Sequence, residues 1–181
     1  FRTDAGKLVV SGIFNNMTTS GNRYVRLFGE GEGDWQTDYA NNASGTAINF
    51  LQKGDGGTWT LSGNNTYNGP TTVAGGRLLV NGSIQNSSSV TVTDGSLGGS
   101  GFINAPVTID VNGTLAPGAS IGTLTISNSL TLFGTTEMEI SLSAADKVRG
   151  LSSVAFGGTL KVVIVGNLTG TEVFKLFEAP P

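Results

Sequence analysis

Glu137 and Glu139 are the residues of this 181-residue sequence whose spacing comes nearest to a catalytic pair. In a β-strand, side chains two positions apart lie on the same face, about 6 to 7 Å from each other. Two carboxylates at such a separation are what a glycoside hydrolase needs. The alternative, which we favour, is a solvated polar face, because the intervening Met138 and the following Ile140 would point into a core.

Most other catalytic arrangements are missing from the sequence. It contains no histidine and no cysteine, which excludes Ser-His-Asp and Cys-His catalysis and the usual zinc ligand sets. A polysaccharide lyase would need basic side chains clustered with carboxylates, yet Arg77 is the only basic residue between Gly56 and Thr136. We therefore predict that the chain is not an enzyme and has no catalytic residue, no cofactor and no metal. A carbohydrate-active β-helix enzyme is kept as a third functional hypothesis.

A second cluster mixes acidic and aromatic side chains between Asn22 and Ser44. We interpret these residues, 22–44, as an inserted loop region that projects from the repeats. The candidate binding loop within it consists of Glu30, Glu32, Asp34, Trp35 and Tyr39. Its three carboxylates also offer the clustered oxygens that Ca²⁺ prefers. The alternative, which we favour, is a solvated acidic loop whose Trp35 packs against the repeats.

Composition and charge exclude several classes of partner. Ten basic residues against 13 acidic ones give a net charge of −3, and no basic stripe is present that would bind nucleic acid. No apolar run approaches the roughly 20 residues of a membrane-spanning helix. We therefore predict no nucleic-acid binding and no membrane insertion by this segment. Apolar residues make up 38%, too many for a disordered chain.

A short motif recurs along the chain: a glycine, a polar residue and then an apolar residue that opens a strand. Its copies begin at Gly57, Gly76, Gly95 and Gly113, so the step from one copy to the next is almost constant. The residues that follow alternate between apolar and polar, which is the strand pattern. Repeats of this length indicate stacked coils, each of which buries its apolar side chains against the next.

The repeats predict an all-β fold, a parallel β-solenoid. Its corners would be Gly-Gly, Asp-Gly or Asn-Gly pairs, such as Asp94-Gly95, which supply a positive φ. An antiparallel sandwich is the alternative, but a sandwich has no reason to repeat the same corner residues. In the solenoid we expect an inward column of Leu78, Leu97 and Leu115. A second column is expected near Val92, Ile109 and Ile126.

The run from Gly54 to Gly76 resembles the autotransporter-associated β-strand repeat, also called the passenger-associated transport repeat. The family's core is Gly-Thr-Leu-Thr-Leu-Ser-Gly, followed by Asn-Thr-Tyr and a Gly-Thr-Thr-Val turn. Here Trp59 replaces the usual Leu, and Pro70 replaces a Gly. Further motifs, such as Leu115-Ala116-Pro117-Gly118, extend the resemblance over about residues 48–177.

This resemblance implies a right-handed parallel β-helix (β-solenoid) in a large secreted or surface-exposed bacterial protein. In autotransporters the repeat lies near the membrane-proximal end of the passenger, where it is thought to help folding during export. We expect the sequence to form one continuous domain and to be a fragment of a longer chain. Residues 1–53 would form N-terminal coils with the 22–44 insertion, and residues 54–181 the repeat solenoid.

The leading functional hypothesis is a structural or display module at the bacterial cell surface, hence extracellular. It would form a stalk, fibre or matrix by coil stacking and self-association. Its partners would be its own chain, other copies or other surface proteins, because strands at the two ends of a solenoid have unpaired backbone groups. The alternative is an adhesin that binds surface glycans.

Overall fold

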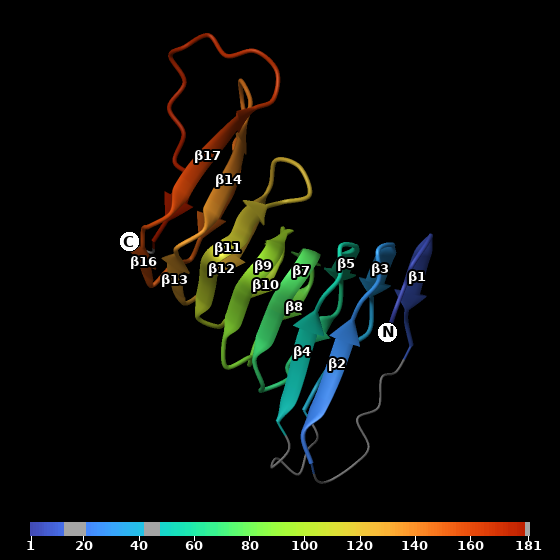
Figure 1. Cartoon of the computed structure of the whole chain (residues 1–181). Coiled ribbons are helices and arrows are strands. Elements are labelled where there is room, and N and C mark those ends of the chain that lie inside the picture. Colours follow the sequence, from blue (N-terminus) through green and yellow to red (C-terminus); the bar gives the residue numbers. More distant parts are fainter. Residues whose placement is uncertain (13–20, 42–47, 180–181) are drawn as a thin grey trace.

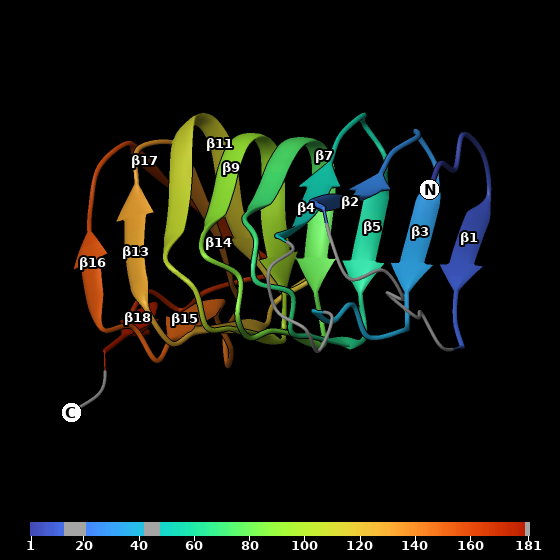
Figure 2. The same cartoon turned by 90° about the horizontal axis from the view of Figure 1, so that it is seen from below.

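The computed structural model describes residues 1–12, 21–41 and 48–179. These residues form strands and no helix, and they wind into coils stacked along one axis (Figures 1 and 2). Two sheets result, one of 12 strands and one of six. All pairings between the named strands are parallel, as in β7 with β9 and β9 with β11. The predicted parallel β-solenoid is therefore confirmed, and the antiparallel sandwich is excluded.

Each complete coil contributes to three faces. The first face contains β2 (Arg23–Leu27), β4 (Asn49–Lys53), the first halves of β7 (Thr71–Val80), β9 (Val90–Gly99) and β11 (Val107–Pro117), then β13 (Ser129–Leu132) and β16 (Ser153–Ala155). The second face contains β1 (Lys7–Val10), β3 (Glu32–Trp35), β5 (Thr58–Leu61), the second halves of β7, β9 and β11, then β14 (Thr135–Ile140) and β17 (Thr159–Ile164). The third face contains β6 (Asn64–Asn65), β8 (Ser83–Ile84), β10 (Phe102–Ile103), β12 (Thr123–Ile126), β15 (Lys147–Arg149) and β18 (Phe177–Glu178).

Glycines make the corner between the first and second faces. Gly76 and Gly95 have φ values of 61° and 77°, a conformation that side chains with a Cβ rarely adopt. A Cβ on Gly76 would also lie 2.3 Å from the carbonyl oxygen of Gly57 in the coil below. Tight stacking of successive corners therefore requires glycine, which explains the recurring motif.

The predicted leucine column is confirmed. Leu78 is in register with Leu97, and Leu97 with Leu115, and all three side chains are fully buried. Trp59 is the preceding member of this column, in register with Leu78. The column is the centre of an apolar core that runs along the stack.

The second predicted column is confirmed in part. Val92 and Ile109 are in register and buried on the first face. Ile126 was assigned to this column wrongly, because it lies on the third face and pairs with Ile103. The next first-face residue after Ile109 is Leu132, since this coil contains an additional turn after Pro117. The even spacing of similar tripeptides along the sequence was therefore a coincidence.

The predicted inserted loop at 22–44 is wrong for the described residues. Residues 23–27 and 32–35 are β2 and β3, which pair in register with β4 and β5. This coil runs from Arg23 to its register partner Asn49 and is longer than the later coils, because more residues separate β3 from β4 than separate β5 from β7. Its composition differs from the later coils because aromatic side chains, including Trp35 and Tyr39, fill its interior. Residues 42–44 of the predicted insertion lie outside the described residues.

Candidate functional site

The five residues of the candidate binding loop do not share one surface. Trp35 and Tyr39 are core residues with exposed fractions of 0% and 1%, and burial raises the pKa of Tyr39 to about 12. Asp34 is also buried, and its carboxylate accepts hydrogen bonds from Ser62 Oγ at 2.7 Å and from Gln36 Nε2 at 2.8 Å.

Only the two glutamates of the candidate loop are exposed. Glu30 accepts a hydrogen bond from the backbone N–H of Gly56 at 3.1 Å, and Glu32 lies on the same surface. Within the described ranges, no three acidic side chains are grouped so that they can hold a metal ion. The calcium hypothesis for Glu30, Glu32 and Asp34 therefore has no geometric support.

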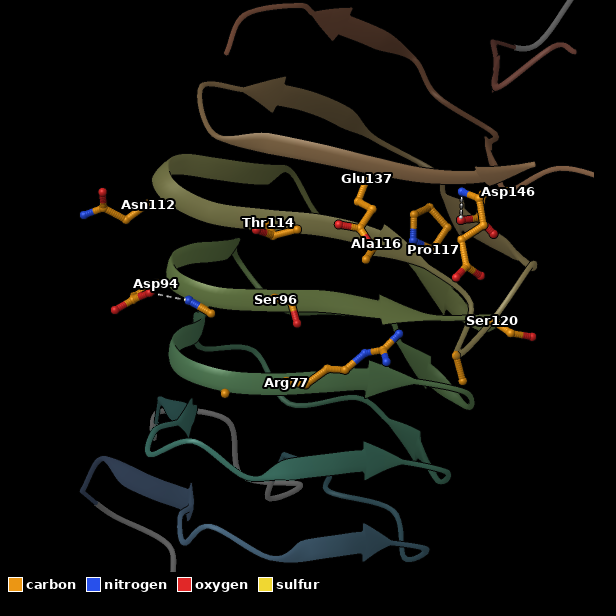
Figure 3. Close-up of a pocket in the computed structure, with 14 residues that line it drawn as sticks. Arg77, Asp94, Ser96, Asn112, Thr114, Ala116, Pro117, Ser120, Glu137 and Asp146 are labelled. Carbon is orange, nitrogen blue, oxygen red and sulfur yellow. Dashed lines mark hydrogen bonds between the residues drawn. The ribbon is translucent and has the colours of Figure 1, made fainter. Parts of the chain in front are cut away.

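A groove on the second face has the clearest site geometry, and sequence reasoning did not identify it (Figure 3). Its volume is about 480 Å³. Outward side chains of β7, β9, β11 and β14 line it, together with the turn after β11 and one residue before β15. The polar lining side chains are Arg77, Asp94, Ser96, Asn112, Thr114, Ser120, Glu137, Glu139 and Asp146.

Coil stacking places these side chains in rows. Arg77, Ser96 and Thr114 occupy equivalent outward positions in three successive coils. Figure 3 shows Arg77, Ser96 and Thr114 on three successive strands, and Glu137 on the strand beyond Thr114. The signal in the sequence that could have revealed this row was the repeat itself, since each of the three residues directly follows the glycine of one copy of the motif.

Arg77 fixes the turn that bounds the groove. Its Nη2 donates a hydrogen bond to the carbonyl oxygen of Gly118 at 3.1 Å. The same carbonyl accepts the backbone N–H of Gly99 at 3.0 Å. The turn is therefore attached to both β7 and β9, although it follows β11 in the sequence.

Asp146 anchors the opposite side of the groove. Its carboxylate accepts the backbone N–H groups of Gly122 at 2.8 Å and of Glu139 at 2.7 Å. Burial raises the pKa of Asp146, the two backbone hydrogen bonds oppose this, and the charges of Glu139 and Glu137 add to the increase. Since both carboxylate oxygens hold the backbone, Asp146 has a structural role.

Glu137 and Glu139 point outward from β14 as predicted, and Met138 and Ile140 point into the core. Glu137 Oε2 forms an ion pair with Lys161 at 2.8 Å. Among the residues that the structure describes, no aromatic side chain lines the groove. The arrangement offers hydrogen-bond donors and acceptors to a polar ligand.

The last coil presents a different kind of surface. Leu160, Val162 and Ile164 are in register with inward residues of β14, yet their exposed fractions are 54%, 46% and 57%. In the same coil the exposed Phe156 packs edge-on against Phe177, with ring centroids 5.1 Å apart. The inward columns therefore end in an apolar edge that no described residue covers.

Comparison with known proteins agrees with this architecture. Residues 51–80 match the sequence profile of the passenger-associated-transport-repeat family. This stretch of the chain is therefore similar to a passenger-associated transport repeat. The matched residues run from β4 through β5 and β6 to the end of β7. The match therefore corresponds to about one coil, followed by the strand that contributes to the first and second faces of the next coil.

The similarity extends beyond the passenger-associated transport repeat. The chain is 39% identical over 98 residues, or 52% of its length, to the adhesin BmaC autotransporter of Brucella suis biovar 1 (strain 1330). It covers 3% of the length of that relative. In the described part of the chain there is no helix of the length and apolarity needed to span a membrane.

Proposed function

We propose that this chain is a structural display module of a bacterial surface or secreted protein, a stretch of solenoid that carries other parts of its polypeptide away from the cell. The passenger-associated transport repeat and the autotransporter relative support this function. The relative is far longer than the chain, as expected for a protein in which such coils act as a spacer.

The observation that carries the proposal is the continuity of the stack. In-register pairing on the second face runs from β1 to β17, and successive coils differ mainly in the lengths of their turns. The inward columns then end at exposed apolar residues of β17. Such an edge pairs with more β-structure, from the same polypeptide, another copy or another surface protein, because its backbone groups are unpaired on one side.

Adhesion is the second candidate function. The relative is named an adhesin, and the groove on the second face offers a surface that can take a ligand. Adhesion and display are compatible, since a spacer can carry a binding surface of its own.

Deletion of one whole coil tests the display function. Residues 83–101 form one coil, because Ser83 is in register with Phe102. Their deletion from the full-length protein would shorten the stack and keep every column in register. We expect surface display of a distal epitope to persist, whereas deletion of residues 83–92, about half a coil, should abolish folding and display. A whole-coil variant that folds, as judged by circular dichroism, but loses display would contradict the spacer function.

A further inference from the structure

The groove on the second face has hydrogen-bonding capacity that the protein itself does not use. Arg77 donates to one protein acceptor, Gly118 O, although its guanidinium carries five N–H groups. The carboxylate of Glu139 and the hydroxyls of Ser96 and Thr114 make no side-chain hydrogen bond to the described residues. All four side chains are half-buried rather than fully solvated.

The charge pattern of the groove disfavours an anion, because four carboxylates (Asp94, Glu137, Glu139 and Asp146) line it against one basic side chain, Arg77. Its attraction for a cation is reduced, since Glu137 is already paired with Lys161 at 2.8 Å and both oxygens of Asp146 accept backbone N–H groups. A cation would also leave the free donors of Arg77 without an acceptor. The described residues form no group of three acidic ligands for a metal ion.

A neutral ligand rich in hydroxyl groups satisfies both kinds of lining residue. A hydroxyl donates to the carboxylates of Glu137 and Glu139 and accepts from Arg77, and the hydroxyls of Ser96 and Thr114 can do either. Hydrogen bonds that involve a charged partner are the stronger ones, so the glutamates and Arg77 would contribute most. We propose that this groove is a binding site for a neutral glycan.

The shape of the groove fits an extended sugar chain. Its row of Arg77, Ser96 and Thr114 crosses three coils, Thr135 continues the row in the fourth coil, and Glu137 lies two residues farther along the same strand (Figure 3). Successive coils are about 4.8 Å apart, so polar groups recur at regular steps along the groove. Its volume of about 480 Å³ accommodates a short oligosaccharide.

The described lining residues provide no aromatic platform, so each site would bind weakly. Attachment would then depend on several copies acting together on one glycan-coated surface. This inference goes beyond the display function and does not depend on it, since a spacer without a ligand would leave the display function intact.

Nuclear magnetic resonance titration of the isotope-labelled chain tests the site. The probes are cellotetraose, maltotetraose and mannotetraose, with trigalacturonate and tetralysine as charged comparisons. We expect at least one neutral tetrasaccharide to shift the backbone amide signals of Arg77, Ser96 and Thr114, and added salt to leave its affinity unchanged. Glu139→Gln should weaken that binding about fivefold, the effect of weakening one hydrogen bond to a charged group.

Two tyrosine variants of β9 provide the matched control. Ser96→Tyr fills the groove, whereas Thr91→Tyr places the same side chain outward on the first face. Binding should be lost in the first variant and kept in the second. The glycan site is excluded if no neutral tetrasaccharide shifts groove signals, or if Ser96→Tyr leaves the binding unchanged. Salt-sensitive binding of tetralysine alone would reassign the groove to a basic peptide, and binding of trigalacturonate alone would reassign it to an acidic glycan.

Discussion

Gly33 lies directly beneath the indole ring of Trp59, with which it is in register on the second face. A Cβ on Gly33 would lie 2.2 Å from Cδ2 of that ring. The Trp59 side chain is fixed there, because its Nε1 donates a hydrogen bond to the carbonyl oxygen of Phe28 at 3.1 Å. The largest side chain of the leucine column is thus accommodated by the absence of a side chain in the coil below it.

This relationship predicts the outcome of a double-mutant cycle. Gly33→Ala should destabilise the chain by about 1 to 3 kcal/mol, since it overpacks the core against a rigid ring. Trp59→Leu alone should cost about 2 kcal/mol through the cavity it leaves. In the Gly33→Ala background the same change should cost little or restore stability. Urea denaturation of the four proteins measures the coupling, and additive effects would show that the two residues are not in contact.

The leucine column predicts a large difference between neighbouring residues of β9. Leu97→Ala should cost about 2 to 5 kcal/mol, because the side chain is fully buried between Leu78 and Leu115. Ser96→Ala should change stability by no more than about 0.5 kcal/mol, because Ser96 points outward. Chemical denaturation compares the two variants, and equal losses would mean that the inward and outward faces have been exchanged.

Lys53 is a buried lysine within an apolar column, between Leu27 and Val73. Its Nζ donates to the backbone carbonyls of Gly54, Asp55 and Gly75, the last two at 2.9 and 3.2 Å. Lys53→Met should cost about 1 to 3 kcal/mol, because it leaves these corner carbonyls without donors.

Lys7→Met is the control for this substitution. Lys7 is exposed on β1, so its replacement should change the free energy of unfolding by no more than about 0.5 kcal/mol. Thermal denaturation compares the two variants. A Lys53→Met protein as stable as the Lys7→Met protein would show that the three carbonyls do not depend on the ammonium group.

Asp146 predicts a dependence of stability on pH. Burial raises the pKa of this carboxyl above its ordinary value of 3.8, so the folded chain keeps the proton at a pH where the unfolded chain has lost it. The contribution of Asp146 to stability is then largest below pH 3.8 and falls as the pH rises through the folded-state pKa.

Asp146→Asn isolates this contribution, because asparagine does not titrate. The variant should be less stable than the unmodified chain, and the difference should be larger below pH 3.8 than at neutral pH. Urea denaturation at both pH values measures it. A difference that grows with pH would contradict the sign of the shift.

The sequence was sufficient to predict the coils with short corners. From Gly57 to Gly113 the repeat spacing equals the strand register, because each motif glycine or its neighbour pairs with the equivalent residue of the next coil. The coil that contains Trp35 is longer, so the same periodicity could not reveal it. As a result, the aromatic residues that fill the core of this coil were interpreted as part of an exposed loop.

The groove could not be predicted from the sequence, for a related physical reason. Arg77 and Glu137 lie far apart in the sequence and line one groove only because the coils between them stack in register. The turn that Arg77 holds at Gly118 also interrupts the repeat, so its position could not be extrapolated from the earlier coils. The carboxylate pair on β14 was predicted, but its basic neighbour Lys161 becomes adjacent only through pairing with β17.

The last coil of the stack has an open edge, which we expect to pair with more β-structure. Val162 belongs to the inward column of that edge, whereas Thr159 begins the same strand with an outward side chain. The variants Val162→Glu and Thr159→Glu therefore add the same charge to β17 at an inward and an outward position.

Sedimentation velocity of the isolated 181-residue chain over a wide range of protein and salt concentrations measures whether this edge pairs. We expect the unmodified chain and Thr159→Glu to associate as their concentration rises. High salt should not disperse them, because apolar contacts and backbone hydrogen bonds are not screened. Val162→Glu should stay monomeric and folded. A monomer at all concentrations for the unmodified chain, or equal association of all three proteins, would show that the inward column of β17 does not drive pairing.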